Sequence, residues 1–470
     1  MRLPIFPVTF IGLALTGLFF SFRTGVADNP PAANDSTVIA GIFREALVNG
    51  KAYMNLAGLC QKAPKRLSGS PGAQVAVEFM QRVMLESGFD RVWLQPCLVP
   101  HWERGEPEQG YIIRNNEAGQ GYRVNLCALG GSVATPADGI TAEIVEVESY
   151  AELDKLGKKG ITGKIVFYNH KFDESQISTF SAYGKAVQYR WQGPAAAEKY
   201  GAVGVLVRSV TSSIDTFPHT GVMRSDSLAA KIPAAAISTY DAEELHRMIQ
   251  KDKSVRFRLV MNCRWFPDVL SYNVCGEIRG SVYPEQVILV GGHLDAWDLG
   301  EGAHDDGAGC VHAIEAVRLF KALGIRPRYT IRAVCFMNEE NGGRGGQAYA
   351  DSATVKNEKH IAAIESDAGG FSPRGFSTEM EPGQKKKIRS WQPLLLPYGI
   401  YDFSGTGGGA DIGPLRKSGT ALMGLEPEGA RYFDYHHTED DLFRHVNRRE
   451  LHMGAAGMAA MVYLIDKYGL

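Results

Sequence analysis

The stretch from residue 286 to residue 340 constrains the fold more than any other part of this chain. Residues 286–290 form a short apolar run typical of a buried strand, and residues 329–336 are rich in β-branched and aromatic side chains. Between them, residues 308–323 place apolar side chains close to a helical period. This succession of strand, helix and strand predicts a parallel α/β sheet.

Polar residues suited to metal binding stand immediately after these two strands. His293 and Asp295 follow the first strand, and the adjacent Glu339 and Glu340 follow the second. Ligands of α/β sheets bind beyond the carboxyl ends of parallel strands, so we expect these side chains to share one site. Imidazole nitrogen and carboxylate oxygen are ligands that zinc accepts in proteins. The sequence therefore predicts a zinc site at this edge of the sheet.

The spacing of these residues indicates separate roles. His293 and Asp295 are two apart on extended chain and point to the same side, so we expect the Asp295 side chain to accept a hydrogen bond from the far ring nitrogen of His293. The side chains of Glu339 and Glu340 diverge, so that one can bind metal while the other faces a substrate water. Because a carboxylate has two oxygens, one aspartate can bridge two metal ions.

Residues 1–27 are typical of an export signal. Arg2 precedes a mostly apolar run from Ile5 to Phe22, and the small residues Gly25 to Ala27 form a cleavage site. An uncleaved membrane anchor is the alternative, since the run is close to the length that spans a bilayer. The small-residue site, and the proline and threonine within the run, favour cleavage. A secreted or periplasmic protein without a stable membrane partner is expected.

The length of 470 residues allows two or three domains. A block at residues 126–253 shows short strands and a short helix but no cluster of His, Cys and acid at ligand spacing, which predicts a separate compact unit. The main domain then consists of residues 28–125 and 254–470. Near its start, residues 37–56 and 72–87 predict two helices.

Charge and cysteine content argue against several other classes. The formal net charge of -2 gives no electrostatic case for nucleic-acid binding. The seven cysteines are odd in number and include no CxxC pair, so the chain is not expected to be a disulfide scaffold. The formation of a single disulfide bond after export stays open. The chain also lacks the GxSxG elbow of serine hydrolases and the HExxH pattern of single-zinc peptidases.

The chain resembles the co-catalytic zinc aminopeptidase superfamily. The resemblance lies in Gly291–Asp298, Asp305–Gly309, the pair Glu339 and Glu340, Asp367 and His437. It implies the zinc exopeptidase fold, an α/β fold whose mixed, largely parallel sheet is sandwiched by helices. Residues 126–253 resemble the β-rich protease-associated domain that family members carry as an insert.

The resemblance also implies two zinc ions per chain, held by five carboxylate and imidazole ligands. These are His293 and Asp367 on one zinc, Glu340 and His437 on the other, and Asp305 as a bridge between them. Glu339 is then the general base. Asp305 is preferred over Asp306 because the bridging acid of the family is the first of such a pair. His437 is preferred over His436 because it precedes Thr438, and the role of His436 stays open.

These assignments imply an exopeptidase that uses a metal-activated water to hydrolyse short peptides or dipeptides with a free N-terminus. Two alternatives are a single-zinc enzyme similar to glutaminyl cyclase and a non-catalytic receptor or binding protein on the same scaffold. The number of bound metal ions would distinguish them. The choice between dipeptidase, aminopeptidase and carboxypeptidase stays open, as does the oligomeric state, with a homodimer among the alternatives.

Overall fold

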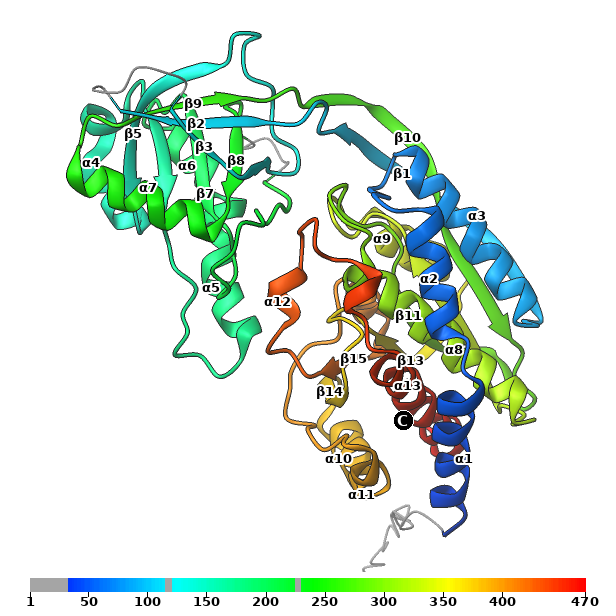
Figure 1. Cartoon of the computed structure of the whole chain (residues 1–470). Helices are drawn as coiled ribbons and strands as arrows, with labels where there is room; N and C mark the ends of the chain where they lie inside the picture. The colour runs from blue at the N-terminus through cyan, green and yellow to red at the C-terminus, as the bar shows by residue number, and fades with distance from the viewer. Residues whose placement is uncertain (1–32, 115–120, 225–229) are drawn as a thin grey trace, which may run out of the picture.

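The computed structural model describes residues 33–114, 121–224 and 230–470. The export signal expected in residues 1–27 lies outside these ranges. Among the described helices, none combines the length and apolar character needed to cross a bilayer. The described residues form two lobes, each built on its own sheet. The long antiparallel ribbon of β1 (Arg91–Glu103) and β10 (Arg264–Ile278) runs from one lobe to the other (Figure 1).

The larger lobe contains a seven-stranded sheet in the order β1-β10-β12-β11-β13-β15-β14. Its four central strands are parallel: β12 (Tyr329–Phe336), β11 (Tyr283–His293), β13 (Lys359–Glu365) and β15 (Ala421–Pro427). The outer strands β1, β10 and β14 (Pro373–Glu379) pair in the antiparallel sense. The expected mixed sheet is confirmed, with parallel pairing confined to its centre.

Helices cover both faces of this sheet. One face shares a hydrophobic core with α1 (Ala33–Asn49), α2 (Ala52–Lys62), α3 (Pro71–Glu86), α8 (Ala308–Ala322), α10 (Pro382–Ser390), α11 (Gln392–Leu395) and α13 (Arg448–Tyr468). The other face packs against α9 (Arg344–Val355) and a 3-10 turn at Gly413–Ser418. In β11, Ile288 and Val290 enter the first core while Val287 and Leu289 enter the second. Burial on both faces explains the unbroken apolar run of this strand.

The first helical segment differs from the expectation. Instead of one helix over residues 37–56, the structure has α1 and α2 with a break at Gly50 and Lys51. A Cβ atom at Gly50 would lie 2.1 Å from the main-chain oxygen of Ala46 and 2.5 Å from Nδ1 of His452. The chain therefore passes too close to α13 for any residue but glycine, and the helix ends there.

The smaller lobe contains an eight-stranded sheet in the order β3-β2-β9-β5-β6-β7-β8-β4. Its strands are β2 (Gln109–Ile113), β3 (Tyr122–Val124), β4 (Leu126–Ala128), β5 (Ile140–Val147), β6 (Ile165–Tyr168), β7 (Gly204–Arg208), β8 (Ala234–Ile237) and β9 (Arg256–Val260). Among the described residues of this lobe, four helices accompany them: α4 (Tyr150–Ile161), α5 (Thr179–Trp191), α6 (Gly193–Glu198) and α7 (Thr239–Lys251). The sheet extends beyond the expected block of 126–253, because β2 pairs with β9 and β9 with β5.

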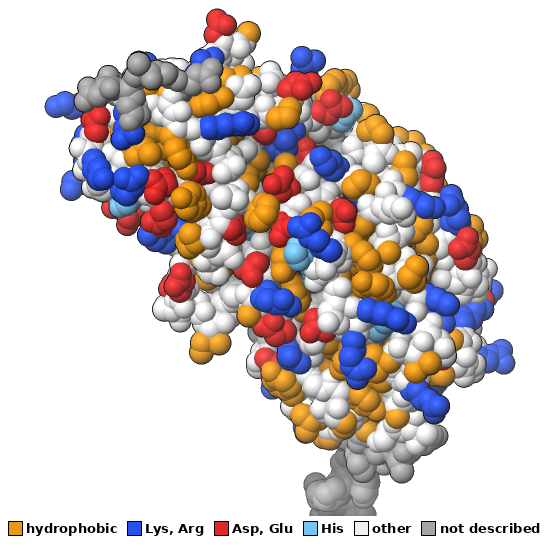
Figure 2. Space-filling model, in the orientation of Figure 1, with side chains coloured by type: hydrophobic (Ala, Val, Ile, Leu, Met, Phe, Trp, Pro, Cys, Tyr) orange, Lys and Arg blue, Asp and Glu red, His pale blue; other side chains and the backbone are white. Residues whose placement is uncertain are grey.

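The surface charge on the face in view is mixed, and the seven cysteines form no disulfide bond. Figure 2 shows basic and acidic side chains interspersed over both lobes on the face in view. All seven cysteines are buried thiols without a disulfide partner, so the expectation that the chain is not a disulfide scaffold is confirmed. Packing and hydrogen bonding hold the described fold together.

Asp35 joins the first described helix to the last. Its buried carboxylate accepts hydrogen bonds from the hydroxyl groups of Tyr463 (2.8 Å) and Tyr468 (2.6 Å) and pairs with Lys467. Burial by itself would raise the pKa of Asp35. Lys467 and the two tyrosines outweigh this effect and hold the pKa below its ordinary value. The ionised form is therefore the one that stabilises the contact between α1 and α13.

We expect Asp35→Asn to lower the free energy of unfolding at pH 7 by about 1–3 kcal/mol, since it removes a charged hydrogen-bond acceptor. A depressed folded-state pKa adds stability above the unfolded-state pKa, about 3.9 for Asp. That stability is lost as the pH falls through the folded-state value. Denaturant unfolding of both proteins should therefore show a deficit at pH 7 that shrinks toward pH 3. A deficit that stays constant over this range would contradict the role of the ionised carboxylate.

Candidate active site

The central parallel strands bring five polar side chains to one edge of the main sheet. His293 is the last residue of β11, Glu340 follows β12, and Asp367 follows β13 by two residues. Asp305 lies in the turn Ala303–Gly307 before α8, and His437 follows the short helix α12 (Tyr432–Tyr435). The structure thus assembles all five expected ligands beyond the carboxyl ends of the strands.

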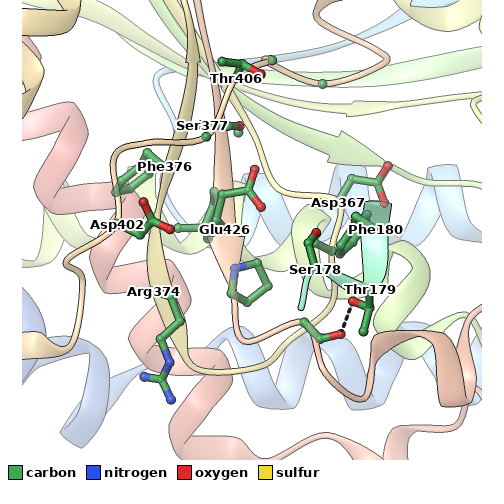
Figure 3. A pocket seen from close by; sticks show the side chains of 18 of the residues that line it. Ser178, Thr179, Phe180, Asp367, Arg374, Phe376, Ser377, Asp402, Thr406 and Glu426 are labelled. Atoms are coloured by element: carbon green, nitrogen blue, oxygen red, sulfur yellow. Dashed lines mark hydrogen bonds between the residues drawn. The ribbon is translucent and has the colours of Figure 1, made fainter. Parts of the chain in front are cut away.

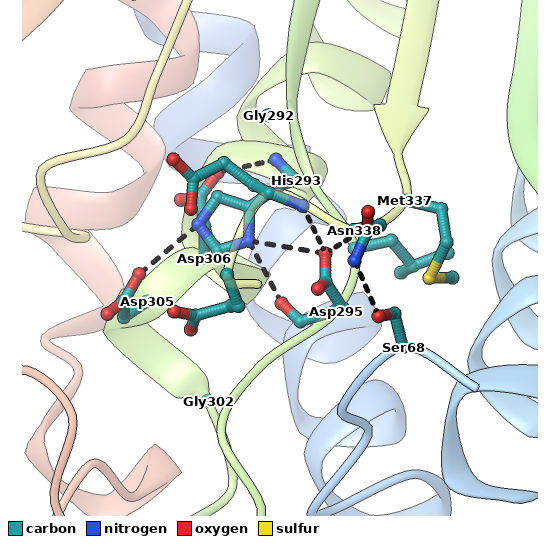
Figure 4. A network of polar contacts seen from close by, with 12 residues as sticks. Ser68, Gly292, His293, Asp295, Gly302, Asp305, Asp306, Met337 and Asn338 are labelled. Atoms are coloured by element: carbon teal, nitrogen blue, oxygen red, sulfur yellow. Dashed lines mark hydrogen bonds and ion pairs between the residues drawn. The ribbon is translucent and has the colours of Figure 1, made fainter. Parts of the chain in front are cut away.

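Asp305 lies between two histidines. Its Oδ1 is 3.2 Å from Nε2 of His293, and its Oδ2 is 3.2 Å from Nε2 of His437. Asp367 Oδ1 lies 3.5 Å from the same nitrogen of His293, and Glu340 Oε2 lies 3.1 Å from that of His437. Figure 4 shows the His293 side of this arrangement. The result is two pairs of histidine and carboxylate that share Asp305.

The donor atoms suit divalent cations. His293, Asp305 and Glu340 offer one ligand atom each within 4.8 Å of one another, as do Asp305, His436 and His437. Asp305 and Glu340 are buried, and Oδ2 of Asp305 and Oε1 of Glu340 have no hydrogen-bond partner. A buried carboxylate oxygen without a hydrogen-bond donor is a favourable position for a bound cation. Nitrogen and oxygen ligands in this combination are those of zinc.

The crowding of acids changes the proton affinity of the site. Burial and the negative charge of Asp305 raise the pKa of Glu340 to about 7. Burial opposes protonation of His437, but the charge of Glu340 and the contact with Asp305 outweigh it and raise its pKa to about 10. Burial also raises the pKa of Glu339 well above its ordinary range, and the charge of Asp367 adds to this. The assembled groups therefore attract positive charge.

Asp295 supports the site in a different way from the one expected. Its main-chain oxygen lies 2.9 Å from Nδ1 of His293, whereas its carboxylate Oδ1 is 3.9 Å from that nitrogen. The carboxylate Oδ1 accepts hydrogen bonds from the main-chain N–H groups of Asn338 (2.7 Å) and Glu339 (3.0 Å) (Figure 4). The expected bond between the Asp295 side chain and His293 is therefore wrong. The carboxylate instead holds the loop that carries Glu339.

Asp306 and Asp441 fix the position of Asp305. Both carboxylate oxygens of Asp306 accept main-chain hydrogen bonds, one from His293 (3.0 Å) and one from Gly309 (2.8 Å). Asp441 Oδ2 accepts the main-chain N–H of Asp305 at 3.1 Å. These contacts tie the turn to the end of β11 and the start of α8. They leave the carboxylate of Asp305 facing the histidines.

His437 also contacts the smaller lobe. Its Nδ1 lies 3.2 Å from the main-chain oxygen of Thr220, and the N–H of Thr220 donates to the main-chain oxygen of His437 at 3.0 Å. Nη1 of Arg190 lies 3.3 Å from the same Nδ1. His436 stacks on His437 with ring centroids 3.5 Å apart, and its Nε2 is 3.7 Å from Oδ2 of Asp305. Of these two adjacent histidines, His437 is therefore the nearer to Asp305, at 3.2 Å.

Two adjoining cavities open on these residues. The first, of about 240 Å³, lies between Glu339, four of the five candidate ligands and three residues of α5 in the smaller lobe, Phe180, Tyr183 and Arg190. The four candidate ligands are Asp305, Glu340, Asp367 and His437. The second, of about 750 Å³, shares Phe180 and Asp367 with it. Figure 3 shows side chains that line this second cavity. Asp367 and residues of the smaller lobe lie on one side of the view, and Arg374, Phe376, Asp402 and Glu426 lie beside them.

Sequence reasoning missed the site residues that come from distant segments. Arg190 and Thr220 lie in the smaller lobe, and no local motif marks them. Arg66, which is fully buried, donates to the main-chain oxygen of Leu294 in the loop after His293. Each belongs to the site only because separate segments pack together. A motif confined to a few neighbouring residues could not have identified them.

An α/β fold with buried histidine and carboxylate side chains gathered beyond the ends of parallel strands is typical of metal-dependent hydrolases. The sequence profile of peptidase family M28 matches residues 273–462. Carboxypeptidase Q of Homo sapiens is 36% identical over 433 residues, which are 90% of this chain and 89% of that protein. Carboxypeptidase Q of Xenopus laevis is 38% identical over 408 residues, 86% of this chain and 84% of that protein. The chain therefore belongs to peptidase family M28 and is a zinc-dependent metallo-exopeptidase.

Solved structures show the same fold over both lobes. A peptidase M28 precursor from Shewanella amazonensis SB2B superposes with a TM-score of 0.86 at 32% identity, covering 92% of this chain and 97% of that one. A zinc aminopeptidase from Bacillus subtilis superposes with a TM-score of 0.62 at 21% identity, covering 88% of this chain and 94% of that one. The second likeness shows the shared fold alone.

Proposed function

We propose that the protein is an exported di-zinc exopeptidase that hydrolyses short peptides with a free N-terminus, dipeptides above all. The observation that carries the proposal is the position of Asp305, which presents one oxygen to each of two histidines at 3.2 Å. A carboxylate shared in this way suits two metal ions rather than one. The carboxypeptidase Q relatives agree with peptide substrates.

The proposed ligands follow from the same geometry. His293 and Asp367 would hold one zinc, Glu340 and His437 would hold the other, and Asp305 would bridge them. The smaller lobe would be an inserted protease-associated domain. It reaches the metal centre through the two hydrogen bonds between Thr220 and His437, so it would contribute to the position of a ligand and not only to the shape of the cleft.

The chain's own residues would divide the remaining work. Zinc, when bound, polarises the scissile carbonyl and lowers the pKa of water. Glu339 lines the cavity and would take the proton of the attacking water and return it to the leaving amine. Asp295 would keep Glu339 in place by accepting its main-chain N–H. No protein nucleophile is needed.

A free α-amine fits the negative side of the cavity. The carboxylates of Glu339 and Asp367 line this side. Capping the amine would leave a carboxylate without its positively charged partner, which is costly in a buried site. The walls that α5 contributes narrow the cleft, so folded proteins would be excluded. Hydrolysis of Ala-Ala but not of its N-acetyl form would support this reading, and equal rates would refute it.

We expect the purified protein to bind two zinc ions per chain and to lose peptide hydrolysis on chelation, because five ligands converge around Asp305. Elemental analysis of dialysed protein gives the stoichiometry, and zinc added back should restore turnover. A fully active protein with a single tightly bound metal would overturn the di-zinc assignment and favour the single-zinc alternative.

A further inference from the structure

Arg190 is the one arginine or lysine among the described residues that line the 240 Å³ cavity. It belongs to α5 of the smaller lobe and is 5% exposed. Its Nη1 donates to the main-chain oxygen of Thr220 (3.2 Å), and its Nη2 donates to the hydroxyl of Tyr183 (2.8 Å). Nε has no partner. A buried positive charge thus lies at the wall of the cavity with donor capacity to spare.

Other buried arginines of the described chain are compensated. Arg104 pairs with Glu108 and Asp298. Arg66 has no carboxylate partner, but all three of its guanidinium nitrogens donate to main-chain oxygens. Within the described ranges, no carboxylate forms an ion pair with Arg190. Since burying an uncompensated charge is expensive, the partner of this guanidinium is expected to be an anion that enters the cavity.

We propose that Arg190 binds the C-terminal carboxylate of a short peptide, which makes the enzyme selective for dipeptides. This inference rests on the proposed function. A planar guanidinium binds a carboxylate through two parallel hydrogen bonds, and arginine is the side chain best suited to that contact. The other lining residues include Glu339 and Asp367, so the cavity has a negative and a positive side. A zwitterion with both ends free matches this distribution of charge.

The length of the ligand follows from the need to hold both of its charged ends within the cavity that Arg190 lines. An extended dipeptide spans about 7 Å, so both charged ends can be held within one small cavity. A third residue would move the carboxylate beyond Arg190 and leave an uncharged peptide group against the guanidinium. Because α5 supplies Arg190, the selection of length belongs to the smaller lobe, whereas the metal ligands belong to the larger one.

The test compares Ala-Ala with Ala-Ala-amide on the zinc-loaded full chain, parent and Arg190→Met. Removing one partner of a buried charge pair typically costs about 10²-fold or more. We expect the parent to favour the free acid by about 100-fold in kcat/KM, and Arg190→Met to bring the ratio close to one by slowing hydrolysis of the acid alone. Arg190→Lys should restore part of the ratio. Lys185→Met removes a positive charge from the exposed side of α5 and should leave the ratio unchanged.

Several outcomes would overturn the proposal. In one, both substrates slow equally in Arg190→Met while the ratio and the zinc content are kept, which assigns Arg190 a structural role. In another, Arg190→Met loses zinc, which means that Arg190 holds His437 in position through its contact with Thr220. If Arg190→Met fails to fold, an unchanged ratio in Arg190→Lys decides against the proposal. If Ala-Glu-amide is hydrolysed as fast as Ala-Ala and this hydrolysis depends on Arg190, then Arg190 binds a side-chain carboxylate instead of the C-terminal one. A parent protein that binds zinc but hydrolyses neither peptide would refute the proposed function itself.

Discussion

Replacing Glu339, the proposed general base, with glutamine is expected to lower kcat by about 10²–10⁴-fold, the usual contribution of general acid–base catalysis, while the zinc content of the protein stays unchanged. Glutamine keeps the shape of the side chain but cannot accept a proton from water. Glu339 lines the cavity, and its N–H remains bonded to Asp295 whatever its side chain, so the loop should keep its place. Single-turnover rates and elemental analysis of the same preparation measure both effects.

The adjacent Glu340 provides the matched control. Its Oε2 lies 3.1 Å from Nε2 of His437, so Glu340→Gln should weaken metal binding at that site and lose activity for that reason. Added zinc should then recover part of the activity of Glu340→Gln and none of that of Glu339→Gln. Equal loss of metal from both variants would show that the roles of the two glutamates have been assigned wrongly.

Arg66→Met should destabilise the larger lobe by about 3–5 kcal/mol, the scale of breaking a buried charged contact. The guanidinium donates to the main-chain oxygens of Leu294 (2.5 Å), Glu301 (2.5 Å) and Gly302 (2.7 Å). These three carbonyls lie on the loop that leads from His293 to Asp305. Without Arg66, the main-chain oxygens of Leu294 and Glu301 would lose their donor, whereas that of Gly302 would keep the N–H of Gly307. His293 and Asp305, two of the proposed metal ligands, would then lose their common support. Denaturant unfolding measures the loss.

The control for this prediction is Arg279→Met. Arg279 is exposed and its Nη2 lies 3.5 Å from Glu285, so its removal should change the free energy of unfolding by less than about 1 kcal/mol. Arg66→Lys tests geometry, because a lysine cannot donate to three separate carbonyls from one position. Similar stabilities for Arg66→Met and Arg279→Met would contradict the supporting role of Arg66.

The amino-acid sequence alone was enough for the features that depend on neighbouring residues. The strand at 329–336 and the helix that begins at residue 308 match the expectation, because side-chain periodicity is a local property. The motifs around His293 and Glu340 lie just after such strands. Parallel strands end at one edge of a sheet, so the meeting of these motifs could be anticipated before the fold was known.

Contacts between distant segments could not be anticipated in this way. The orientation of the Asp295 carboxylate depends on where the loop at Glu339 passes, 44 residues further along the chain. β9 belongs to the smaller lobe because it pairs with β2 and β5, although its sequence reads equally well as the start of the main domain. Arg190 meets His437 across 247 residues. Such contacts arise from the packing of segments that lie far apart in the sequence, and packing leaves no periodic signal in either segment.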